Sequence, residues 1–144
     1  MADMNDFLTR LQTALNTLDP APDIVSIVPQ DRDDCRPPQG KHWWVNISPA
    51  TEDETPEPGQ YYVSAYTAVV TVWIDSKKKH GDLVDYLAGR VAAVRDKLRY
   101  NKLSGWLRRA LVSDRFAAGE YISGGESDTV YGYQMEVTGE KQDN

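Results

Sequence analysis

The side chains able to act as nucleophiles are few in this 144-residue chain, which carries one cysteine, Cys35, and two histidines, His42 and His80. Nucleophilic catalysis needs a serine or cysteine within reach of a base. Cys35 lies seven residues before His42, so a Cys/His pair is one hypothesis for a catalytic site. No family signature surrounds either residue, and the competing interpretation is that Cys35 is an ordinary small loop residue.

An acidic run suggests metal binding at first sight. Asp31, Asp33 and Asp34 stand where a calcium loop would begin, but an EF-hand needs glycine at its sixth position and glutamate at its twelfth. Arg36 and His42 occupy those positions. Zinc sites need Cys and His at set spacings, which one cysteine and two separated histidines cannot supply. The sequence therefore predicts no metal, no cofactor and no catalytic centre, and we expect a protein that is not an enzyme.

The charge balance narrows the classes of partner that the protein could bind. Sixteen Lys and Arg against 22 Asp and Glu give a formal net charge of −6, whereas non-specific nucleic-acid binding needs a basic surface. The chain has no apolar stretch near the roughly 20 residues of a membrane-spanning helix, and no secretory signal is visible at its start. We therefore expect neither membrane contact nor specific binding of DNA.

Hydrophobic periodicity predicts the elements that would position any site. Apolar residues recur every three or four positions over 4–18 and 83–100, which is typical of amphipathic helices. Short β-branched or alternating segments predict strands over 24–28, 42–48, 61–75, 110–116 and 130–138. This order predicts one α+β domain over 1–144, with a mostly antiparallel sheet and the two main helices packed on one face.

Two segments are expected to lack regular structure. Residues 49–59 are acidic and proline-rich, and such a composition buries too little apolar surface to fix a conformation. We predict a mobile loop there, whose acidic side chains contact a partner: Glu52, Asp53, Glu54 and Glu57. The polar end of the chain, 139–144, is expected to be a disordered tail.

The longest predicted strand, 61–75, is apolar on one face and mixed, rather than polar, on the other. One face, which we assign to the core, carries Tyr62, Tyr66, Ala68, Val70, Val72 and Ile74. The other face carries Val63, Val69 and Trp73, although a half-exposed strand should be polar on its second face. Helices packed on one side of the sheet cannot cover these three side chains. We therefore predict that Val63, Val69 and Trp73 form a subunit interface.

The order of the elements is distinctive over most of the chain. An N-terminal helix (MNDFLTRLQTAL) precedes short strands and a long strand (YYVSAYTAVVTVWID), and a helix follows directly (GDLVDYLAGRVAAVRDKL). A Leu-Ser-Gly segment (LSGWLRRALVSDRF) then leads into the last strands (TVYGYQMEVTGE). This order resembles that of the tail terminator, or tail-completion, proteins of long-tailed bacteriophages.

The resemblance implies a structural protein of the virion, assembled in the host cytoplasm, with neither catalysis nor a cofactor. Proteins of that family form a ring, typically a homohexamer, which caps the finished tail tube and stops its polymerisation. The other face of the ring meets the head–tail connector protein, and DNA passes through without specific binding. A cyclic ring uses a heterologous contact, in which one patch meets a different patch on the next copy.

Two other interpretations stay open. The chain would also suit another phage morphogenesis component, such as a head–tail connector or baseplate subunit, and assembly on tube ends separates these roles. A small α+β enzyme or ligand-binding domain would place its site between the sheet and Cys35 and His42. Replacing those two residues would impair such an enzyme and leave a structural protein unaffected.

Overall fold

The computed structural model describes residues 4–28, 43–57, 61–75, 83–100, 111–123 and 126–143. Within these ranges the chain forms α1 (Met4–Leu15), β1 (Val25–Ile27), β2 (Trp43–Glu57), β3 (Tyr61–Asp75), α2 (Leu83–Tyr100), β4 (Leu111–Ser123) and β5 (Glu126–Asp143). The predicted bounds of β3 and α2 are confirmed, and α1 ends three residues before the predicted end.

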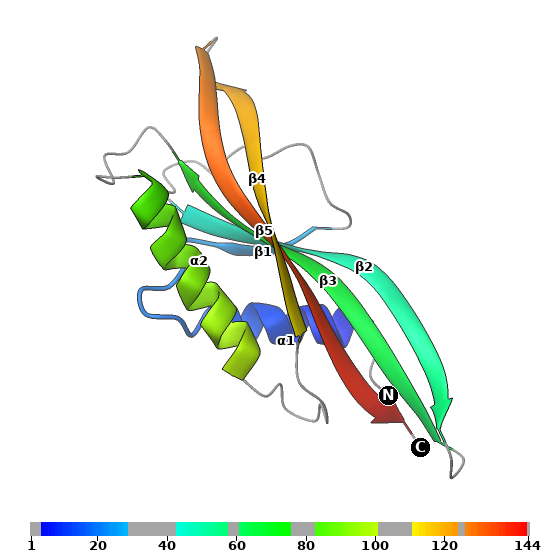
Figure 1. Cartoon of the computed structure of the whole chain (residues 1–144). Coiled ribbons are helices and arrows are strands. Elements are labelled where there is room, and N and C mark those ends of the chain that lie inside the picture. Colours follow the sequence, from blue (N-terminus) through cyan, green and yellow to red (C-terminus); the bar gives the residue numbers. More distant parts are fainter. Residues whose placement is uncertain are drawn as a thin grey trace.

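The strands form one sheet in the order β1-β2-β3-β5-β4. β1 runs parallel to β2, and the other three neighbouring pairs are antiparallel. Both helices lie against the same side of the sheet, and the far ends of β2, β3 and β5 extend beyond them (Figure 1). The predicted fold class is therefore confirmed: a single α+β domain with a mostly antiparallel sheet and two helices on one face.

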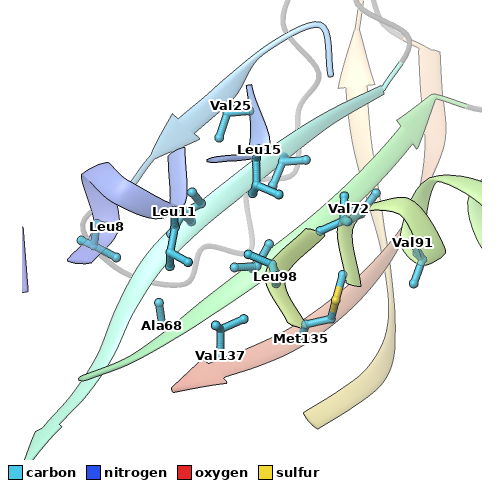
Figure 2. Close-up of a cluster of buried hydrophobic side chains, with 14 of the residues drawn as sticks. Leu8, Leu11, Leu15, Val25, Ala68, Val72, Val91, Leu98, Met135 and Val137 are labelled. Carbon is cyan, nitrogen blue, oxygen red and sulfur yellow. The ribbon is translucent and has the colours of Figure 1, made fainter. Parts of the chain in front are cut away.

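The hydrophobic core lies between the helices and the sheet (Figure 2). It includes the predicted core residues of β3 whose side chains are described: Tyr66, Ala68, Val70, Val72 and Ile74. The ring of Phe7 in α1 stacks on Tyr66 with a centroid distance of 6.2 Å. Full burial of one such side chain stabilises the fold by about 1.5–3 kcal/mol, so this layer fixes α1 on the sheet.

The predicted loop at 49–59 is wrong for 49–57, where β2 continues as a strand. Its pairing with β3 runs from Thr51 opposite Thr67 to Glu57 opposite Tyr61, after a register shift between Pro49 and Thr51. β1 pairs with β2 only up to Ile47, so this half of β2 is an edge among the described strands. Edge strands tolerate proline and charge, and an acidic composition therefore did not prevent strand pairing.

The predicted disordered tail at 139–144 is wrong for 139–143, which belong to β5. These residues pair with β3 from Gly139 opposite Tyr66 to Asp143 opposite Tyr62. The physical reason is the length of β3, since the backbone groups along both of its sides need hydrogen-bond partners. β2 supplies hydrogen-bond partners on one side of β3, and β5 supplies them on the other. The polar side chains of 139–143 do not prevent this backbone pairing.

Candidate functional site

The second face of the sheet carries two of the predicted interface residues, Val69 and Trp73. They expose only 7% and 6% of their surface in the single chain, and Trp44, opposite Trp73 on β2, exposes 1%. The reason for expecting an interface, that these side chains need cover from a second subunit, is therefore wrong. The interface itself stays a prediction. Val63 of β3 lies opposite Thr55 of β2, and its side chain is outside the described part.

The indole of Trp73 fits this face because its neighbour on β5 has no side chain. Gly132 pairs with Trp73, and a Cβ at Gly132 would lie 2.5 Å from Cε3 of the ring. Real Cβ atoms do not approach that closely, so only glycine permits this packing without a shift. The sequence contained the signal, a glycine in an alternating strand, but the register that places it beside Trp73 is a tertiary property.

Adjacent tryptophans of β2 point to opposite faces, because side chains alternate along a strand. Trp43 belongs to the core cluster beneath the helices, whereas Trp44 pairs with Trp73 on the other face. Trp43 is held in place by Asp23. The backbone N–H of Trp43 donates to Oδ2 of Asp23 at 3.2 Å, and the N–H of Asp23 donates to the carbonyl oxygen of Trp43 at 3.0 Å.

An arginine of α2 contacts two aromatic rings at this end of β2. The guanidinium carbon of Arg90 lies 5.5 Å from the ring centroids of both Trp43 and Tyr86. Nε of Arg90 is buried, and none of the described residues accepts a hydrogen bond from it. The residue as a whole is half-buried. Cation–π contacts stabilise by about 0.5–2 kcal/mol, so these two rings hold the guanidinium in one orientation.

We call Trp43, Tyr86 and Arg90 the Arg90 cluster. Burial raises the pKa of the Tyr86 hydroxyl above 10.0, the positive charge of Arg90 lowers it, and the negative charge of Asp23 raises it. Further along α2, the guanidinium carbon of Arg95 lies 5.7 Å from the ring centroid of Tyr133. Two arginines of α2 thus rest on aromatic rings at the sheet. Tyr86 and Arg90 are four residues apart on α2, which brings them onto one face of the helix, whereas no local pattern joins Arg90 to Trp43.

The four acidic residues predicted to contact a partner all lie on the edge half of β2. Glu52 is exposed and stands opposite Tyr66, while Asp53, Glu54 and Glu57 follow along the same strand. The structure thus gathers the four on one strand, as their sequence proximity requires. It does not place them beside the second-face residues Val69 and Trp73. The cross-strand neighbours of Val69 are Ser48 and Glu136, and those of Trp73 are Trp44 and Gly132.

Metal ligands do not gather in the described part of the chain. No group of three or more His, Cys, Asp and Glu side chains that could hold a metal occurs among those residues. Cys35, His42 and the acidic run at 31–34 lie outside the described residues. Among the described helices, none is both long and apolar enough to cross a membrane.

A scan of the chain against models of known protein families finds no match, and a search of the curated proteins finds none either. The fold and the described surfaces therefore define the class. The chain is an α+β domain whose sheet is packed on both faces and extends beyond its helices.

Proposed function

We propose that this chain is a structural subunit of a bacteriophage tail, which assembles into a ring, hexameric in our proposal, that closes the tail tube. The ring ends polymerisation of the tube protein and joins the tail to the head–tail connector protein. The observation that carries the proposal is the form of the sheet. It is open at both sides in the described structure, with β4 at one edge and the acidic half of β2 at the other.

Two different edges suit a ring better than a symmetric pair. Pairing of the β2 edge with its own copy would bring Glu52, Asp53, Glu54 and Glu57 against like charges, with Pro49 and Pro56 removing hydrogen-bond donors. A contact between unlike surfaces of successive copies avoids this repulsion. Such a heterologous contact closes into a ring when its rotation fits a whole number of copies.

The proposed role needs no catalysis and no cofactor. The net charge of −6 disfavours binding to phosphates, so DNA would pass through the ring without specific contacts. The protein would act in the virion, at the neck of the tail, after assembly in the host cytoplasm. The resemblance in element order, the confirmed fold class and the open edges support this proposal together.

The decisive experiment measures assembly. Native mass spectrometry at micromolar protein should give the mass of a ring, and addition of the ring to growing tail tubes should yield capped tubes that stop elongating. A chain that stays monomeric with tubes present would overturn the proposal. A ring that forms but leaves tube growth unchanged would favour a connector or baseplate component. Loss of an enzymatic activity on replacing Cys35 and His42, with assembly intact, would favour the interpretation of the chain as a small α+β enzyme.

A further inference from the structure

We propose that the Arg90 cluster of one copy binds the acidic half of β2, residues 52–57, of the next copy. This inference rests on the proposed ring and identifies the two unlike surfaces that meet in it. It is a contact between the partly exposed Tyr86 and Arg90 of α2 on one subunit and the extended β2–β3 ends of its neighbour.

The Arg90 cluster has the composition of an interface anchor. Tyr and Arg are among the side chains that dominate the energy of protein interfaces, and Tyr86 and Arg90 are both partly exposed. Trp43 is buried and serves to orient the guanidinium of Arg90. Because the rings already orient the guanidinium of Arg90, binding a carboxylate would cost little further side-chain entropy. Hydrogen bonds between a guanidinium and a carboxylate are charge-assisted and directional.

The acidic residues cannot be the partner of Arg90 within one chain. Trp43 and Glu52 are nine residues apart on the continuous strand β2, which at about 3.3 Å per residue separates them by roughly 30 Å. Glu57 lies further along the same strand, and that end of β2 points away from α2 (Figure 1). A contact between these surfaces is therefore a contact between two copies.

The charges of the two surfaces are complementary. Residues 50–59 contain four acidic residues and no Lys or Arg, and Glu52 is exposed. α2 carries Arg90, Arg95 and Lys97, all partly exposed. Asp85 and Asp96 are also exposed on α2, so complementarity is confined to the arginines that contact the sheet and is not a property of the whole helix.

The first test reverses the charges and measures oligomer mass at micromolar concentration. Arg90→Glu and Glu52→Lys should each lower the apparent association constant at least tenfold, and the double variant should recover part of the loss. Arg10→Glu is the matched charge-reversal control for Arg90→Glu, since Arg10 pairs with Asp6 within α1, at 3.0 Å. Wild-type oligomer mass for Arg90→Glu and Glu52→Lys would overturn this inference while leaving the ring intact.

A second test does not depend on charge reversal, so it remains informative if Arg90→Glu does not fold. In a Cys35→Ser background, Arg90→Cys protein is mixed with Glu52→Cys protein and oxidised. Disulfides need Cα atoms within about 7 Å, so a disulfide-linked dimer in the mixture, and in neither protein alone, supports the contact. No linked dimer from proteins that still form rings would refute it, whereas a monomeric wild type would refute the proposed function itself.

Discussion

Gly132→Ala tests how the second face of the sheet is packed. The added Cβ would lie 2.5 Å and 2.6 Å from two atoms of the Trp73 ring, while ordinary contact begins at 3.4 Å. The indole would have to move by almost an ångström. It has little room to do so, because Trp73 and its cross-strand partner Trp44 expose only 6% and 1% of their surfaces.

The expected change in the free energy of unfolding is the difference between two opposing contributions. Overpacking a well-packed site costs about 1–3 kcal/mol, and replacing glycine in a strand interior by alanine returns about 0.5–1 kcal/mol. We expect Gly132→Ala to lower the free energy of unfolding by about 1–2 kcal/mol. For a chain of this length that corresponds to a fall in Tm of roughly 3–6 °C.

The assay is urea and thermal unfolding followed by circular dichroism at two protein concentrations. Gly89→Ala is the matched control, since a Cβ at Gly89 meets nothing within 4 Å, and helix propensity predicts a gain of up to about 1 kcal/mol. Adding Trp73→Phe to Gly132→Ala should cost less than the two single changes together, because the smaller ring relieves the clash. A Gly132→Ala protein as stable as the wild type would refute the packing. A loss that appears only as reduced oligomer mass would place Trp73 at an interface.

Three further predictions concern other parts of the fold. Gly139→Ala should destabilise the domain by about 1–2 kcal/mol in urea unfolding, because its Cβ would lie 2.6 Å from Cε1 of Phe7; unchanged stability would contradict the seating of α1. Alternate backbone amides over 51–57 should be protected in hydrogen exchange, since β3 pairs with them; immediate exchange would contradict the strand and support the predicted loop. Arg90→Gln should raise the pKa of Tyr86 further above 10.0, because the cation that lowers it is lost. Since that pKa is raised in the fold, the free energy of unfolding falls as pH rises past 10.0. The difference in absorbance titration between the wild type and Tyr86→Phe measures the pKa, and urea unfolding below and above pH 10.0 measures the stability.

The strongest periodic signals gave the fold. The bounds 61–75 and 83–100 are reproduced because each segment carries a long apolar pattern, of period two in β3 and of three and four in α2. α1 ended early for a local reason. The hydroxyl of Thr17 donates to the carbonyl oxygen of Ala14 at 2.6 Å, and the N–H of Leu18 donates to that of Leu15 at 3.3 Å. These bonds form a turn in which the apolar spacing continues but the helix does not.

The candidate surfaces were less predictable because they depend on register. Acidity and proline over 49–57 describe the side chains, whereas strand formation there depends on backbone groups of β3 that require a partner. Of the four acidic residues from Glu52 to Glu57, the structure describes only the side chain of Glu52, which is exposed. Their contact with a partner stays a prediction. The contact of Arg90 with Trp43 joins residues 47 positions apart, and no local pattern indicates it.

The packing of β3 decides where an assembly of this chain can form contacts. Every side chain of β3 from 68 to 74 is buried in the single chain, on the helix side and on the opposite side alike. This stretch of β3 therefore leaves no apolar face for a partner, although the alternation of β3 first implied one. In the part of the chain that the structure describes, the surfaces that remain for an interface are the edges of the sheet, the strand ends beyond the helices and the partly exposed side of α2. Two of these, the acidic half of β2 and the Arg90 cluster, carry opposite charge and lie at opposite ends of one strand. That separation favours contacts that run from copy to copy in one direction, which is the geometry that a ring requires.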